Sequence, residues 1–196
     1  MELAKAIDNR HSIREFEEKK VSKKLIKELI ESGTKSPSAC NRQPWIFYCV
    51  DSKEKRNQIA KLLKETLKVF KKDIDAKPTL IRKVTQNFYS NLGGAQNIIF
   101  IFREKKKNDA LHIKPNDFAS IACCAENIML KAVELGLGSC WVGSFKDPKT
   151  EKKLSKLIRA KTKEELVCSL IIGYPKKDSK VLKREKRNLG EIINFV

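Results

Sequence analysis

Histidines and paired cysteines are scarce in this sequence. Its only histidines are His11 and His112, and its six cysteines show no C-x-x-C spacing. Structural zinc sites draw on closely spaced cysteines and histidines, so the sequence predicts no metal site. Several cysteines instead lie in apolar segments, as Cys49 does in FYCV (47–50), where a free thiol behaves as a small buried hydrophobic side chain. Free thiols are typical of a reducing compartment, which also argues against disulfides.

Long hydrophobic runs are also absent. The apolar stretches at 45–50 and 98–102 are far shorter than the roughly 18 residues that a membrane-spanning helix needs. The first residues, MELAK, lack the pattern of a signal peptide. We therefore expect a soluble cytoplasmic protein with no membrane partner. With 196 residues, of which 41% are hydrophobic, the chain can bury a sizeable core, and we expect one domain over 1–196.

Acidic residues are few relative to basic ones, 24 against 42, which gives a formal net charge of +18. This excess raises nucleic acid, an anionic membrane or an anionic cofactor as partners. Aromatic residues make up only 7% of the chain and do not alternate with the lysines as a base-stacking platform would require. The lysine-rich stretches 61–72 and 149–163 also contain acids, which favours a solvated basic surface. A basic nucleic-acid-binding module without catalysis is the alternative.

Hydrophobic periodicity predicts helices and strands in irregular order. Helical spacing is found over 2–9, from a cap at Ser22 to a stop at Gly33, and over 53–72, 118–135 and 150–159. Compact apolar runs predict buried strands over 45–50, 97–102 and 166–172. The polar span 103–115 is predicted to be a loop, with the next helix starting at Asn116. Because the elements do not alternate as regular βαβ units, the pattern favours an α+β fold.

The segment GLGSCWVG (136–143) is not a dinucleotide-binding motif. That motif needs a strand before it and a third glycine, whereas a predicted helix precedes this segment and Trp141 occupies the third place. A glycine-flanked apolar segment can still let the backbone approach a ligand and donate N–H groups to it. The alternative is a tight turn that leads into the core. Hydrolytic chemistry has little support, since the sequence has no G-x-S-x-G motif.

The segment RHSIR (10–14) places two arginines around a serine. If the chain is extended here, Arg10, Ser12 and Arg14 project to one side and Ile13 to the other. Guanidinium groups donate paired hydrogen bonds to oxygen, so this side suits a phosphate or another planar anion. A pair of surface arginines after a helix is the alternative reading.

Two further segments are polar or basic. The stretch SPSACNRQPW (36–45) is too polar and proline-broken for a helix or a strand, and it ends on Trp45, which begins a predicted strand. The stretch 183–187, KREKR, leads into an apolar tail. It is either a phosphate clamp or an exposed run of charge.

Taken together in this order, the segments RHSIREF, SPSACNRQPW, GLGSCWVG and IIGYP resemble the four landmarks of the FMN-dependent nitroreductase family. The resemblance spans nearly the whole chain. It implies a nitroreductase-like α+β fold, with a central, mostly antiparallel sheet flanked by helices. It also implies an intertwined homodimer in which both subunits contribute to each FMN site.

The resemblance assigns cofactor-binding roles position by position. Arg10, with His11 and Ser12, would hold the phosphate and ribityl chain, and Arg14 would meet the flavin near N1 and the C2 carbonyl. The partner subunit would supply Pro37, Ser38, Asn41 and Gln43. The backbone of Cys140, Trp141, Val142 and Gly143 would cover one flavin face and direct N–H groups at N5 and O4. Lys186 and Arg187 would close on the phosphate, with Arg184 as a competitor for this role, although Asn188 stands where the family has proline.

The mechanism that the resemblance implies is ping-pong hydride transfer. NADH or NADPH would stack on the exposed flavin face, deliver hydride to N5 and leave, and an electron-poor acceptor such as a nitroaromatic or a quinone would take its place. Arg14 would be the catalytic side chain in an electrostatic sense, because a fixed cation near N1 stabilises the negative charge that reduction brings.

Overall fold

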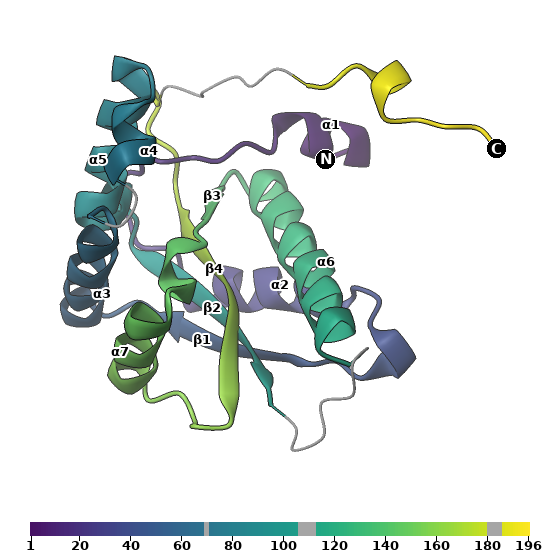
Figure 1. Ribbon diagram of the computed structural model, residues 1–196, viewed down its shortest axis with the longest axis horizontal. Helices are drawn as coiled ribbons and strands as arrows, with labels where there is room; N and C mark the ends of the chain where they lie inside the picture. The colour runs from purple at the N-terminus through teal and green to yellow at the C-terminus, as the bar shows by residue number, and fades with distance from the viewer. Residues whose placement is uncertain (69–70, 106–112, 180–185) are drawn as a thin grey trace.

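A four-stranded antiparallel sheet forms the centre of the part of the protein that the structure describes (Figure 1). The structure is a computed structural model that describes residues 1–68, 71–105, 113–179 and 186–196. The strands are β1 (Trp45–Val50), β2 (Asn97–Glu104), β3 (Gly138–Trp141) and β4 (Glu164–Gly173). Their order across the sheet is β1-β2-β4-β3, so β3 is an edge strand.

Helices cover both faces of the sheet. They are α1 (Leu3–Asn9), α2 (Lys23–Thr34), α3 (Lys53–Thr66), α4 (Lys71–Asp75), α5 (Thr79–Asn91), α6 (Ile113–Glu134) and α7 (Pro148–Ile158). Short 3-10 turns are η1 (Ala39–Asn41), η2 (Leu92–Gly94), η3 (Ser144–Lys146) and η4 (Leu189–Glu191). The mixture of helices with an antiparallel sheet confirms the predicted α+β class. In the ranges that the structure describes, no helix combines the length and apolar character that crossing a membrane requires.

The central strand β2 has a hydrophobic core on each side, because successive side chains of a strand point to opposite faces. Phe100 and Phe102 belong to the core that α3, α5 and α7 cover. Ile99 and Ile101 belong to the core that α2 and α6 cover. A strand buried on both faces reads as a continuous apolar run, which explains why the run at 97–102 predicts it correctly.

The packing of α2 on α6 corrects the role predicted for Gly33. This glycine lies inside α2, which ends at Thr34, rather than acting as the helix stop. A Cβ atom at Gly33 would lie 2.7 Å from Cγ1 of Ile128 and 2.9 Å from Sγ of Cys124. The missing side chain therefore lets α6 approach α2 closely, as in Figure 1.

The predicted loop over 103–115 is too long at both ends. Strand β2 continues to Glu104, and α6 begins at Ile113 rather than at Asn116. Pro115 therefore lies in the first turn of the helix, where a backbone N–H would have no intrahelical acceptor and its absence breaks no hydrogen bond. The helix predicted over 53–72 is also too long, because α3 ends at Thr66.

Helices α4 and α5 and strand β3 were not predicted from the sequence as separate elements. Ile81, Val84 and Phe88 of α5 follow helical spacing, so this helix was missed although its sequence carries the signal for it. Strand β3 has four residues and carries a glycine, a serine and an exposed Trp141, so it lacks the apolar run of a buried strand. Its segment was expected to be a tight turn or a close backbone approach to a ligand.

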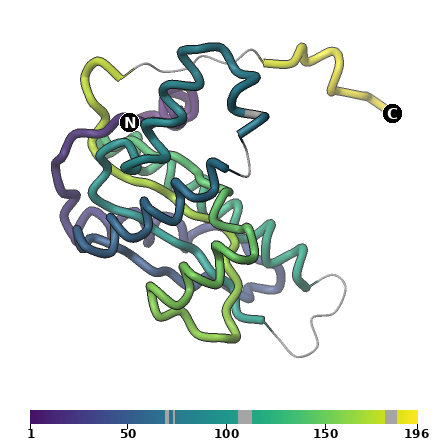
Figure 2. The backbone as a smooth tube through the Cα atoms, turned by 60° about the vertical axis from the view of Figure 1, so that its left-hand side comes forward, coloured from purple at the N-terminus to yellow at the C-terminus, as the bar shows by residue number. Residues whose placement is uncertain are grey.

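The C-terminal residues 186–196 extend away from the sheet and its helices. Two views 60° apart agree on this, as Figure 2 shows for the yellow end of the tube. Phe195 is 97% exposed, and Leu189 is exposed as well. This tail therefore buries little of its apolar surface within its own chain.

Candidate functional site

The segment that follows α1 runs along the edge of β3 that does not pair with β4. The Ile13 N–H donates to the Ser139 carbonyl oxygen (2.9 Å), and Ser12 and Ser139 form a parallel bridge. Ile13 packs beside Gly138, where a Cβ atom would lie 2.8 Å from Cγ1 of Ile13. Ser12, the next residue toward the N-terminus, is exposed. The structure thus places the RHSIR segment directly beside the GLGSCWVG segment.

Arg10 is held at the start of this segment by an ion pair with α6. Its Nε atom lies 3.3 Å from Oε1 of Glu126, and both side chains are partly exposed. The contact uses Nε, which leaves the two terminal nitrogens of the guanidinium with N–H donors for an anion. Glu126 was not expected from the sequence, because nothing in the pattern of α6 distinguishes it from a solvated acid.

Arg14 lies next to β3 further along the same segment. Its guanidinium donates to the Ser12 carbonyl oxygen (3.2 Å). Burial raises the pKa of the Cys140 thiol to about 11, while the positive charge of Arg14 acts in the opposite direction. The charge of Arg14 therefore lies within electrostatic reach of β3.

The turn η2 fixes the backbone of Arg14. A Cβ atom at Gly93 would lie 2.1 Å from the Arg14 carbonyl oxygen, and Gly93 has a φ of 63° that favours glycine. The Phe16 N–H also donates to the Gly93 carbonyl oxygen (2.8 Å). Sequence reasoning missed Gly93, because its contact with Arg14 joins segments far apart in the chain.

Within residues 140–143, the backbones of Cys140 and Val142 pair with β4, whereas those of Trp141 and Gly143 do not. The Val142 N–H donates to the Ser169 carbonyl oxygen of β4 (2.9 Å), and Cys140 pairs with Ile171. Their side chains lie in the core. In an antiparallel strand the N–H groups alternate in direction, so the N–H of Trp141 points to the free edge. No described residue accepts from the Gly143 N–H either.

The surroundings of these two residues are open. Trp141 is 39% exposed, and a Cβ atom at Gly143 would meet nothing within 4 Å. A planar ligand could therefore approach the edge of the sheet here and accept hydrogen bonds from the backbone. Just beyond Gly143, the hydroxyl groups of Tyr89 and Ser144 form a hydrogen bond of 2.5 Å that ties η3 to α5. No motif in the sequence singles out Tyr89.

The polar loop over 36–44 is attached to α6. The Ala39 N–H donates to Oγ of Ser120 (3.4 Å), and the Asn127 amide donates to Oγ of Ser36 (2.8 Å). In Figure 1, η1 lies beside the N-terminal half of α6, whereas α1 lies beside its C-terminal end. Among the described residues no hydrogen bond or ion pair joins this loop to the Arg10–Arg14 segment, although Asn127, the partner of Ser36, is next to Glu126, the partner of Arg10.

The loop holds an uncommon backbone conformation. Cys40, Asn41 and Gln43 have φ angles of 52°, 52° and 45°, a region that costs non-glycine residues on the order of 1–3 kcal/mol each. Ser38 stabilises the loop by accepting from the Gln43 N–H (3.1 Å), and Asn41 accepts from the Gln43 amide (3.1 Å). Pro37, Asn41 and Gln43 are exposed, so their outer faces are available to another molecule.

Arg42 anchors the loop to a buried carboxylate. It donates to both oxygens of Asp117 at 3.2 Å, and the side chain of Asp117 is only 3% exposed. Asp117 also accepts from Arg103 of β2 (3.3 Å), whose side chain is 1% exposed. Bidentate pairs of this kind fix both direction and position. Sequence reasoning missed Arg42 and Asp117, which lie 75 residues apart.

The basic residues of the tail lie apart from the other predicted site residues. Lys186 and Arg187 are exposed, and Nε of Arg187 lies 3.7 Å from Oε2 of Glu191 within the tail itself. Both belong to the segment that extends away from the sheet in Figures 1 and 2. Arg184 lies outside the described residues. In the described parts of the chain, no group of three or more histidine, cysteine or acidic side chains could hold a metal ion.

Comparisons with known proteins agree with these motifs. The sequence matches the profile described as the nitroreductase family over residues 7–174. YfhC of Bacillus subtilis (strain 168), provisionally named an NAD(P)H nitroreductase, is 27% identical over 184 residues, which are 93% of this chain and 89% of that protein.

Solved structures share the fold. A BluB-like flavoprotein from Clostridium difficile 630 has a TM-score of 0.76 at 23% identity, and the match covers 100% of this chain and 99% of the other. A nitroreductase with bound FMN from Desulfitobacterium hafniense DCB-2 also has a TM-score of 0.76, at 19% identity, with the same coverage of 100% and 99%.

Proposed function

Because the chain belongs to the nitroreductase family, we propose that it is an FMN-dependent oxidoreductase that carries hydride from NAD(P)H through bound FMN to an electron-poor acceptor. The observation that carries the proposal is the end of the β3 edge beyond Ser139, where the Trp141 N–H and, just past the strand, the Gly143 N–H have no described acceptor and lie near Arg14. A cofactor that gains negative charge along one edge is stabilised by such donors and by a fixed cation.

The residues present at this edge fit FMN. Arg10 keeps its terminal N–H donors free for a phosphate, and the exposed Ser12 adds a hydroxyl group close by. The open space at Gly143 leaves room for a planar ring system. Cys140 and Val142 support the site differently, since their backbone pairs with β4 and their side chains fill the core beneath it. Bound FMN would supply the atom that accepts and returns hydride.

Arg14 has an electrostatic task in this proposal. Reduction of the flavin adds negative charge that a nearby guanidinium stabilises without a proton transfer. Because η2 fixes its backbone, only the side chain of Arg14 would adjust to that charge. The backbone N–H groups of Trp141 and Gly143 would orient the cofactor, so hydride transfer needs no acidic side chain.

We further propose that the protein is a homodimer and that its sites form between subunits. The loop that carries the exposed Asn41 and Gln43 is attached to α6, and among the described residues no hydrogen bond or ion pair joins it to the Arg10–Arg14 segment of its own chain. The surface of α6 beside it carries exposed small residues, Ala119, Ala122 and Cys123. A second copy packed on α6 would cover this stripe and could bring the loop to the other chain's flavin.

One site that serves both donor and acceptor in turn implies ping-pong kinetics. The chain lacks a dinucleotide-binding glycine motif, so a nicotinamide that stacks on the flavin itself fits the sequence better than a separate cofactor domain. Nitroaromatics and quinones are the acceptors proposed, because both take up electrons at an exposed planar group. The name of the Bacillus subtilis relative, an NAD(P)H nitroreductase, supports this choice.

The visible spectrum tests the proposal directly. The purified protein is expected to carry flavin or to take up added FMN, and anaerobic NADH or NADPH should bleach the flavin absorbance. A nitroaromatic or a quinone added next should restore it. A protein that fails to bind FMN contradicts the proposal as a whole, whereas bound FMN that neither nucleotide reduces contradicts only the nicotinamide donor and directs attention to another donor, such as a ferredoxin.

A further inference from the structure

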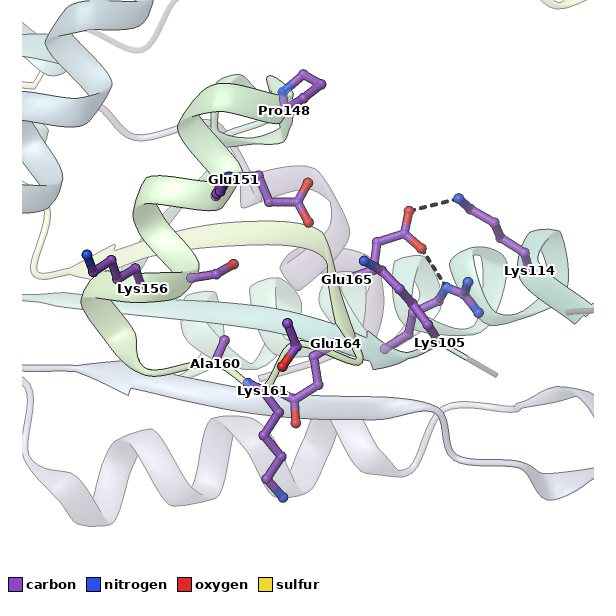
Figure 3. A pocket seen from close by; sticks show the side chains of 13 residues that line it. Lys105, Lys114, Pro148, Glu151, Lys156, Ala160, Lys161, Glu164 and Glu165 are labelled. Atoms are coloured by element: carbon purple, nitrogen blue, oxygen red, sulfur yellow. Dashed lines mark hydrogen bonds and ion pairs between the residues drawn. The ribbon is translucent and has the colours of Figure 1, made fainter. Parts of the chain in front are cut away.

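Two basic cavities lie outside the candidate flavin site, and they differ in how their charges are compensated. The larger, about 800 Å³, is bounded by α7, by the start of β4 and by the start of α6 (Figure 3). Its Glu165 pairs with Lys114 (2.8 Å) and with the buried Arg103 (3.1 Å). In Figure 3, Lys156 and Lys161 point away from that pair. The buried cation of this cavity is therefore already neutralised.

The smaller cavity, about 600 Å³, lies between α3 and the turn at the end of α5. Its lining includes four cations, Lys53, Arg56, Lys61 and Lys64, and one carboxylate, Glu18. The three lysines recur along α3 at intervals that place them on one helix face. In the described ranges none of the three forms an ion pair. This cavity therefore has more positive than negative side chains in its lining, and its lysines have no acidic partner among the described residues.

Arg56 is the buried member of the group. It is only 8% exposed, and its guanidinium donates to two neutral oxygens, the Asp51 carbonyl (2.6 Å) and Oε1 of Gln96 (2.5 Å). The Asp51 carboxylate acts on Arg56 electrostatically but forms its ion pair with Lys20 (3.1 Å). A buried cation is costly unless an anion pairs with it directly. Arg56 has further N–H donors that these two bonds do not use.

The far wall of the cavity belongs to the turn that fixes Arg14. Leu92 and Gly94 of η2 line the cavity, and Gly93 between them contacts the Arg14 backbone. The cavity therefore adjoins the support of the candidate flavin site without sharing a side chain with it.

We propose that this cavity binds a phosphate-bearing anion with two or more negative charges, such as pyrophosphate or the diphosphate group of a nucleotide. Guanidinium and ammonium groups are the protein's usual partners for phosphate oxygens. A site with four cations and one acid calls for more than one negative charge, and the volume exceeds what a single phosphate fills. The occupant would supply the direct anionic partner that Arg56 lacks. This site is separate from the proposed FMN function and does not depend on it.

Calorimetric titration of FMN-loaded protein at low ionic strength tests the site with pyrophosphate and, separately, with ADP. Loading with FMN keeps the phosphate probe away from Arg10. We expect saturable binding of one anion per chain. The double substitution Lys61→Gln and Lys64→Gln should weaken it about tenfold, or about 1.4 kcal/mol. Tighter binding of ADP than of pyrophosphate would identify a nucleotide as the occupant, and equal binding would show that the diphosphate alone is recognised.

The matched control is the double substitution Lys152→Gln and Lys156→Gln, which removes the same charge from the other cavity. It should leave pyrophosphate affinity unchanged. Equal loss in both double variants would show a diffuse charge effect and would overturn the proposal, as would the absence of saturable binding to the unmodified protein. Arg56→Gln, checked for folding by circular dichroism, should abolish binding. The α3 lysines report on this cavity whether or not the protein takes up FMN.

Discussion

Arg14 is positioned by backbone contacts on both sides. The neighbouring Ile13 N–H is bonded to the edge of β3, and Gly93 packs against the Arg14 carbonyl. Its backbone is therefore held in place, while its guanidinium donates to the Ser12 carbonyl oxygen and forms no ion pair among the described residues. A charge of this kind can change the energy of a bound flavin without changing the stability of the fold.

Substitution of Arg14 tests whether its charge acts on the bound flavin and not on the stability of the fold. Arg14→Gln should slow anaerobic flavin reduction by NAD(P)H about tenfold to a hundredfold, since it removes one preorganised group from the charge that forms. It should also lower the reduction potential of the bound flavin. Stopped-flow absorbance and equilibration with a redox dye measure the two effects. Arg14→Lys is the control and should retain part of both; if Arg14→Gln leaves rate and potential unchanged, Arg14 has no electrostatic role.

The buried thiols make stability fall at alkaline pH. Burial, with a smaller contribution from Cys123, raises the pKa of Cys124 from 9.0 to about 12. Between these values the unfolded chain loses the proton and the folded chain keeps it, so unfolding is favoured as pH rises. The loss is at most about 1.4 kcal/mol per pH unit for one thiol.

Urea unfolding from pH 8 to 11 measures this slope. Cys124→Ala should be less stable at pH 8, because it leaves a cavity. Its stability should nevertheless decline less steeply above pH 9 than that of the unmodified protein. Parallel pH profiles for the two proteins would contradict the assignment.

Single residues also show why the sequence groups only part of the candidate site. Arg10, Ser12 and Arg14 follow one another along an extended segment, so a local pattern is enough to group them. Gly93 and Asp117 act on residues far away in the chain, through contacts that exist only in the folded protein. No local pattern contains that information.

At the scale of elements, the sequence predicts the helices and strands whose own apolar residues form a regular hydrophobic pattern. The core strands and α6 are apolar enough to be found, whereas the short strand β3 depends on its edge position. Helix α5 was overlooked even though Ile81, Val84 and Phe88 follow helical spacing. Helix boundaries fail for a related reason, because Pro115 is compatible both with a loop and with a first helical turn.

The contact between α2 and α6 can be tested with a methyl group. Gly33→Ala gains helix propensity of roughly 0.5–1 kcal/mol, but its Cβ would lie 2.7 Å from Ile128. Overpacking typically costs about 1–3 kcal/mol, so net destabilisation is expected in chemical denaturation. Gly143→Ala is the control, because nothing lies within 4 Å of its Cβ. A Gly33→Ala protein as stable as the control would show that α6 shifts freely.

The loop over 36–44 should lose its shape without its anchor. Arg42→Gln removes the bidentate pair with Asp117, while Asn41 and Gln43 keep conformations that are unfavourable by themselves. FMN affinity should fall about tenfold, which is about 1.4 kcal/mol, in a fluorescence titration. Lys35→Gln, an exposed charge change just before the loop, should have no effect. Unchanged affinity in Arg42→Gln would mean that the loop does not contribute to the flavin site.

On the scale of the whole molecule, the positive charge is spread over two cavities and several helix surfaces rather than gathered on one aromatic platform. This distribution supports small anions as ligands better than a nucleic-acid strand, which needs stacking residues along a continuous groove. The exposed tail, in contrast, would need an apolar surface to pack against, and the outward-facing loop would need a polar one. The proposed second copy of the chain would provide both.

The tail offers the sharpest test of that assembly. Phe195 is 97% exposed and Ile192 48% exposed, so replacing both with glutamate should leave the folding of an isolated chain nearly unchanged. In a dimer the same residues would lie against the partner, where two buried carboxylates are strongly unfavourable. Light scattering after size exclusion should therefore show a dimer for the unmodified protein and a monomer for the double variant, with weaker FMN binding. Leu80→Glu on α5, 46% exposed, is the control and should remain dimeric; a double variant that also stays dimeric, with unchanged FMN affinity, would show that the tail does not hold the subunits together.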